Sequence, residues 1–100
     1  MANYYLTNRA VEDLSEIWNY TIDEWSEAQA DKYYYALIDC FHDLAENPEI
    51  GKDYEGIAKD LLGFLVNKHL VFYRRINPGS IEITRILHGR IDLKVRFWEQ

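Results

Sequence analysis

The sequence has little cysteine and proline, and it has no long apolar run. Its one cysteine, Cys40, cannot form an internal disulfide, which excludes a disulfide-stabilised scaffold and predicts a reducing, cytoplasmic location. No apolar stretch approaches the roughly 18 residues that a membrane-spanning helix needs, and residues 1–7 lack the basic and apolar regions of a secretory signal. With no internal repeat, low-complexity tract or linker, the 100 residues predict one domain, 1–100, with no membrane association.

Positive charge is scarce in the first part of the chain. Residues 1–60 hold four Lys or Arg and 14 Asp or Glu, a net charge of −10, and residues 61–100 hold seven and three, a net charge of +4. An overall charge of −6 argues against direct nucleic acid binding, because phosphate neutralisation dominates such binding. The basic second part predicts a surface that attracts an acidic partner segment. The alternative is that the charge asymmetry is only a solvated acidic surface.

The acidic part predicts two amphipathic helices that form an antiparallel hairpin over about residues 8–46. Apolar residues recur at spacings of three and four in both halves, and Thr7 and Ser26 are placed to cap the two helices. Asn47-Pro48 predicts the end of the second helix. Because almost no linker separates the helices, they must fold back on each other. The faces predicted to be buried include Trp18, Ile22, Phe41 and Leu44.

The basic part predicts a small antiparallel sheet over about residues 61–88, followed by a tail, 89–100. Residues 69–76 and 81–88 are rich in β-branched and aromatic side chains, and Asn77-Pro78-Gly79-Ser80 between them is typical of a hairpin. Apolar residues at successive positions around Phe72 indicate a central strand covered on both faces. Residues 4–6 predict a short first strand, and the tail fits a strand, a short helix or a docked segment. The fold class is therefore α+β: an N-terminal strand and an antiparallel helical hairpin packed on a small antiparallel sheet.

Candidate chemistry is limited to one cluster. The sequence has no Cys-x-x-Cys, His-Glu-x-x-His or glycine-rich phosphate motif, so no metal ion or cofactor is expected. Arg85, His88, Arg90 and Asp92 bring a cation, an imidazole and a carboxylate to the end of the last predicted strand, a mixture suited to general acid–base catalysis. The favoured alternative is structural: Arg85 pairs with a carboxylate such as Asp92, because a buried, unpaired Arg costs about 3–5 kcal/mol.

Three stretches together resemble the ParE toxins of the RelE/ParE superfamily, and they cover nearly the whole chain. The first is the helical part from Thr7 to Tyr33, with Trp18, Trp25 and Gln29 at matching positions. The second is Leu44-Ala45-Glu46-Asn47-Pro48, followed by Gly51-Lys52. The third is His69-Leu70-Val71-Phe72-Tyr73-Arg74, followed by Ile83-Thr84-Arg85-Ile86-Leu87-His88 and Asp92. The resemblance implies the toxin of a bacterial type II toxin–antitoxin pair, with a helical hairpin on a small sheet. ParE-like proteins poison DNA gyrase by binding, and a cognate ParD-like antitoxin silences them in a hetero-oligomer.

The resemblance leaves two alternatives open. RelE-like relatives cut mRNA in the ribosome, which would make Arg85, His88, Arg90 and Asp92 catalytic, although this chain is acidic and has no Tyr or His after Asp92. ParE-like sequences carry an Arg in the stretch that reads Asp60-Leu61-Leu62-Gly63-Phe64 here, so an inactive homologue that keeps only antitoxin binding is the other alternative.

Two sets of surface residues follow as expectations from the resemblance and the charge pattern. The antitoxin segment is expected to be apolar on one face and acidic on the other, and to contact Trp18, Trp25, Tyr34, Arg74, Arg75, Arg85 and Arg90. The target is expected to contact Arg90, Lys94, Arg96, Phe97 and Trp98.

Overall fold

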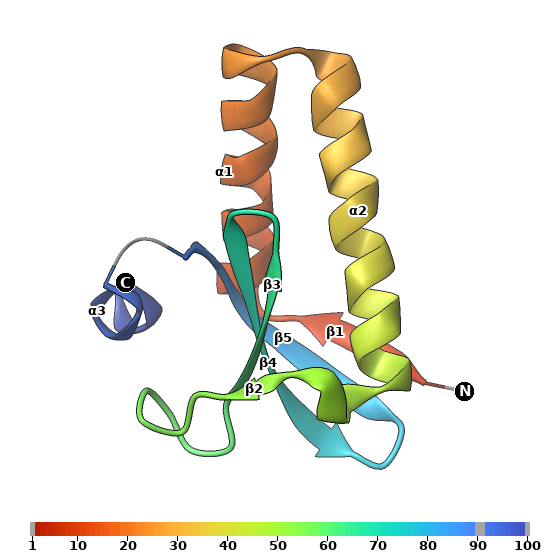
Figure 1. The fold of residues 1–100 in the computed structure, drawn as a ribbon, viewed down its shortest axis with the longest axis vertical. Coiled ribbons are helices and arrows are strands. Elements are labelled where there is room, and N and C mark those ends of the chain that lie inside the picture. The colour runs from red at the N-terminus through yellow and green to blue at the C-terminus, as the bar shows by residue number, and fades with distance from the viewer. Residues whose placement is uncertain (1, 90–91, 100) are drawn as a thin grey trace.

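A computed structural model describes residues 2–89 and 92–99, which form a hairpin of two helices on a five-stranded sheet. The hairpin stands on one side of the sheet (Figure 1). No helix in these two ranges is long and apolar enough to cross a membrane. The elements, in chain order, are β1 (Asn3–Leu6), α1 (Asn8–Glu24), α2 (Glu27–Glu46), the 3₁₀ helix η1 (Pro48–Ile50), β2 (Lys52–Asp53), β3 (Leu62–Val66), β4 (His69–Asn77), β5 (Ser80–His88) and α3 (Leu93–Trp98).

The predicted hairpin and its boundaries are confirmed. The hydroxyl of Thr7 accepts the Ala10 amide at 3.1 Å, and that of Ser26 accepts the Gln29 amide at 3.1 Å, so both helices begin where the capping residues indicate. Phe41 and Leu44 of α2 are buried as predicted. Trp18 and Ile22 of α1 are only half-buried. The end of the hairpin where α1 meets α2 extends beyond the sheet (Figure 1).

The sheet has the strand order β1-β5-β4-β3-β2. The predicted antiparallel hairpin is confirmed: β4 pairs with β5 across Pro78-Gly79, and Gly79 has a φ of 101°, which favours glycine. β1 adds to the edge of β5 in parallel, so the sheet as a whole is mixed. The sequence did not indicate β2, whose two residues pair only with Gly63 and Leu62 of β3.

Both faces of the sheet are covered, as the apolar run around Phe72 predicts. On one face, α1 and α2 pack over residues of β4 and β5. On the other face, Phe72 packs with Leu61, Leu70 and Leu87 in a second, smaller core that includes side chains of α3. Of the three structures expected for the tail, a strand, a short helix or a docked segment, the described residues form a short helix, α3, that is docked on the sheet. The two cores comprise Ala10, Leu37, Cys40, Phe41, Leu44, Ala45, Val71, Tyr73, Ile81, Ile83 and Ile86 on the hairpin side, and Leu61, Leu70, Phe72 and Leu87 on the α3 side.

Candidate protein-interaction surface

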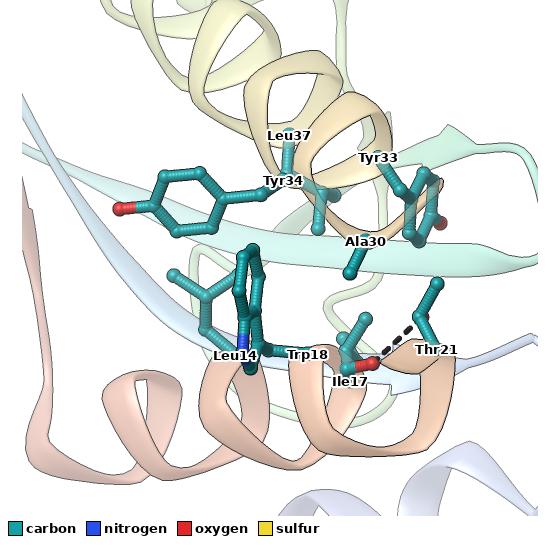
Figure 2. Close-up of a pocket in the computed structure, with 8 residues that line it drawn as sticks. All are labelled: Leu14, Ile17, Trp18, Thr21, Ala30, Tyr33, Tyr34 and Leu37. Atoms are coloured by element: carbon teal, nitrogen blue, oxygen red, sulfur yellow. Dashed lines mark hydrogen bonds between the residues drawn. The ribbon is translucent and has the colours of Figure 1, made fainter. Parts of the chain in front are cut away.

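The inner face of the hairpin carries a shallow apolar pocket (Figure 2). Trp18 of α1 and Tyr34 of α2, both predicted antitoxin contacts, meet there edge to face with ring centroids 5.9 Å apart. Trp25, the third predicted aromatic contact, lies just after α1 and is 72% exposed. Exposed and half-buried aromatic side chains of this kind are enriched where proteins bind one another. The pocket is lined by Leu14, Ile17, Trp18, Thr21, Ala30, Tyr33, Tyr34 and Leu37.

A second, larger cleft of about 380 Å³ lies between α2 and β3, and no sequence pattern pointed to it. Ile50 of η1, which lines the cleft, is 47% exposed, so the cleft has an accessible apolar wall. Cys40 lies at its base, where burial raises the pKa of the thiol to about 11 and keeps it protonated. We name this site the α2–β3 cleft; it is lined by Ala36, Asp39, Cys40, Asp43, Leu44, Ile50, Phe64, Leu65 and Val66.

The predicted basic surface is partly neutralised by internal ion pairs. Arg74 lies 3.4 Å from a carboxylate oxygen of Glu82, and Arg75 lies 4.0 Å from one of Glu49. All four side chains are substantially exposed, so each pair contributes no more than about 1 kcal/mol and opens readily for a partner. Of the other two cations predicted to contact the antitoxin, Arg85 is buried, and Arg90 lies outside the described residues.

Arg85 is buried and holds three elements together. Its Nε and Nη2 donate to the two carboxylate oxygens of Asp13 at 2.7 and 2.9 Å, and its Nη1 donates to the carbonyls of Arg96 and Phe97 in α3 at 2.8 and 3.1 Å. Asp13 also accepts the Ile86 amide at 3.0 Å, a group that β1 is too short to reach. The hydrogen bonds to Asp13 raise the pKa of Arg85 further above its usual range. The structure thus gives the buried Arg85 a carboxylate partner, as expected, but that partner is Asp13 and not Asp92.

The four predicted catalytic residues do not meet as a group in the described part of the chain. Arg85 is only 6% exposed and turns to Asp13 and α3. Asp92 caps α3 by accepting the Val95 amide at 3.3 Å. His88 lies opposite His69 on β4, with ring centroids 5.6 Å apart. Arg90 lies outside the described residues.

A hydrogen-bonded cluster that the sequence did not indicate joins α2 to the end of the sheet. The Tyr33 hydroxyl donates to the Val66 carbonyl at 3.0 Å and lies 2.7 Å from Nδ1 of His69. When that hydroxyl donates to Val66, Nδ1 of His69 must carry the proton and donate to the hydroxyl oxygen. Burial, with a smaller contribution from His88, lowers the pKa of His69 to about 4, and burial raises the pKa of Tyr33 to about 12. Both side chains are therefore neutral near pH 7.

The residues expected to contact the target lie on α3. Phe97 faces the second core, whereas Lys94, Arg96 and Trp98 are exposed. Trp98 is 61% exposed, although its indole Nε1 donates to the Ile57 carbonyl at 3.2 Å. Lys94 and Trp98, four residues apart, share an accessible side of α3. Arg96 lies elsewhere on the helix, with its Nε 2.8 Å from a carboxylate oxygen of Glu99, and Phe97 fixes the helix to the sheet.

No group of three or more His, Cys, Asp or Glu side chains within residues 2–89 and 92–99 is arranged to hold a metal ion.

Comparison with known sequences identifies the relatives of this chain. Residues 4–93 match the family model described as the ParE toxin of the type II toxin–antitoxin system parDE. The chain is 34% identical over 92 residues to Toxin ParE1 of Mycobacterium tuberculosis. That alignment covers 92% of this chain and 94% of the relative. It is also 34% identical over 94 residues to Toxin ParE1 of Caulobacter vibrioides, covering 94% and 96%.

Solved structures with the same fold are also toxin–antitoxin proteins. A chain of the chromosomal ParDE system from P. aeruginosa superposes with a TM-score of 0.73, covering 88% of this chain and 96% of the other. A chain of the toxin–antitoxin complex RelBE2 from Mycobacterium tuberculosis superposes with a TM-score of 0.66, covering 87% and 96%. Both are 17% identical in sequence, so these two likenesses establish the fold alone.

Proposed function

Because this chain belongs to the ParE toxin family of type II toxin–antitoxin systems, we propose that it inhibits DNA gyrase by binding and that a ParD-like antitoxin silences it. Inhibition by binding needs accessible contact surface and no catalytic group. The hairpin aromatics, the α2–β3 cleft and the exposed side of α3 supply such surface.

The observation that carries inhibition by binding is the environment of Arg85. Stabilising the charge that develops on a phosphate during RNA cleavage requires a cation whose donors are free to reach it. Arg85 instead directs its Nε, Nη1 and Nη2 at Asp13 and the α3 carbonyls. Releasing it for catalysis would leave Asp13 without its counter-ion in a buried site, which costs several kcal/mol.

We place the antitoxin along α2 and the target on α3. The aromatic pocket at Trp18 and Tyr34 and the α2–β3 cleft both border α2, so one extended antitoxin segment can contact both. Trp98, Lys94 and Arg96 lie on α3, which packs on the opposite face of the sheet from the hairpin. On this arrangement the antitoxin and the target use different faces of the toxin, and the complex is a hetero-oligomer.

One observation favours ribosome-dependent mRNA cleavage as a second candidate. His88 and His69 lie side by side at the end of the sheet, and a neutral imidazole can accept a proton in general base catalysis. The third candidate, an inactive homologue, is favoured by residues 60–64, which contain no Arg.

Induced expression in a bacterial host, followed over time, separates these candidates. Plasmid supercoiling and mRNA cleavage are measured in the same cultures, with and without co-expression of the cognate antitoxin. Broken or relaxed plasmid DNA with intact message supports gyrase inhibition. Cleavage of mRNA at particular codons that disappears in the His88→Ala variant supports the ribonuclease. Normal growth supports the inactive homologue.

A further inference from the structure

The α2–β3 cleft borders an open edge of the sheet. β2 pairs only through Lys52 with Gly63 and Asp53 with Leu62, so it provides no neighbour for Phe64–Val66. Val66 and His69 flank the two-residue turn between β3 and β4, and residues in that position exchange their backbone hydrogen bonds with each other. Alternation along β3 then directs the backbone N–H and C=O of Leu65 away from β4, toward the cleft. An extended peptide can pair with this edge as a sixth strand.

The side chains above this edge are acidic. Asp39 and Asp43, one helical turn apart on α2, line the cleft and are exposed. Neither forms an ion pair with any residue in the described part of the chain. The floor beneath them is apolar, made by Leu44, Phe64 and other side chains. A Lys or Arg could lie with its aliphatic stem on that floor and its charged end at the two carboxylates.

We propose that the α2–β3 cleft binds an extended, cationic segment of the antitoxin, which adds to the β3 edge at Leu65 and places a Lys or Arg against Asp39 and Asp43. This inference rests on the proposed function, because it names the chemistry of a segment of that partner. It departs from the sequence-based expectation of an acidic antitoxin segment. Of the seven cations that motivated that expectation, Arg74 and Arg75 lie beside Glu82 and Glu49, and Arg85 is buried against Asp13.

The test compares two pairs of neutralising substitutions in the full-length toxin. Asp39→Asn with Asp43→Asn removes the carboxylates of the cleft. Asp23→Asn with Asp31→Asn is the matched control, because it changes the net charge equally at exposed helical positions outside the cleft. Affinity for the purified cognate antitoxin is measured by calorimetry at low and physiological salt, and exchange of the Leu65 amide is followed by NMR in the free toxin and in the complex.

The inference predicts three results. The cleft variant should bind the antitoxin about fivefold to tenfold more weakly than the parent, as expected for two partly exposed charge contacts, and the control should stay within about twofold. The Leu65 amide should exchange at least about tenfold more slowly in the complex, because a new strand protects it. Replacing the Lys or Arg residues of the antitoxin segment by Gln, one at a time, should reproduce the loss at one or two positions.

Other results would overturn the inference in distinguishable ways. A tight complex that leaves Leu65 exchange unchanged and binds both variants equally would refute the cleft assignment while leaving the proposed function intact. Tighter binding by the cleft variant would mean that the segment is acidic. Protection of Leu65 that grows with the concentration of toxin alone would identify a second copy as the occupant. Absence of any complex with the antitoxin would refute the proposed function, and the inference with it.

Discussion

Replacing Asp13 with Asn tests the buried centre of this structure. Asn has nearly the same size as Asp, but it removes the charge that balances Arg85 and puts an amide group where one carboxylate oxygen accepts. Arg85 is 6% exposed, so its charge would stay buried without a counter-ion. Breaking such a pair from one side costs about 3–5 kcal/mol. That is a large share of the roughly 5–15 kcal/mol by which small domains are stable.

The assay is urea unfolding of purified parent and variant, followed by tryptophan fluorescence and far-UV circular dichroism. The exposed pair between Arg9 and Glu12, 3.6 Å apart on α1, supplies the matched control. Glu12→Gln should change the free energy of unfolding by less than about 1 kcal/mol, because exposed pairs contribute little. If Asp13→Asn lies as close to the parent as this control does, Arg85 does not depend on Asp13 and the account of the buried centre is wrong.

Three further substitutions, one of them with a matched control, test the two cores and the buried imidazole. Phe72→Ala should lower the free energy of unfolding by about 3–5 kcal/mol in urea melts, and a loss below about 1 kcal/mol would show that β4 is not central. Gly51→Ala would place a methyl group against the Tyr73 hydroxyl and should lower the free energy of unfolding by about 1–3 kcal/mol. Gly56→Ala is the control, because the added carbon would meet nothing within 4 Å, and it should leave the free energy of unfolding unchanged in the same melts. The pKa of His69 is about 4 in the fold against 6.5 ordinarily, so the unfolded chain binds this proton first as the pH falls. Stability should therefore decrease between those pH values, by about 1–2 kcal/mol once solvent screening of this partly exposed group is allowed for. His69→Gln should flatten that part of the stability–pH curve, and an unchanged slope would contradict the assignment.

Features that depend on neighbouring residues could be predicted from the sequence. The caps at Thr7 and Ser26 depend on amides three residues ahead, and both are confirmed. The hairpin through Pro78-Gly79 and the burial of Phe72 follow from turn chemistry and from a continuous apolar run, and both are confirmed.

Features that depend on distant residues could not be predicted. The Asp13 carboxylate and the Arg85 guanidinium are 72 positions apart. The sequence instead favours Asp92 as the partner of Arg85, because Asp92 is close to Arg85 in the chain. The α2–β3 cleft borders a stretch of β3 that the two-residue β2 leaves unpaired, since β2 begins at Lys52, opposite Gly63. No local sequence pattern predicts where the pairing of a strand edge begins or ends. The half-burial of Trp18 is a feature that periodicity alone does not give.

The most direct test of gyrase inhibition uses purified components. Relaxed plasmid, ATP and purified gyrase are mixed with the purified toxin, and supercoiling and double-strand breaks are read on gels with and without an excess of antitoxin. We expect the toxin to block supercoiling or trap broken DNA in proportion to its concentration, and the antitoxin to restore normal supercoiling. Full gyrase activity at a large excess of a toxin that still arrests growth and still binds its antitoxin would contradict the account.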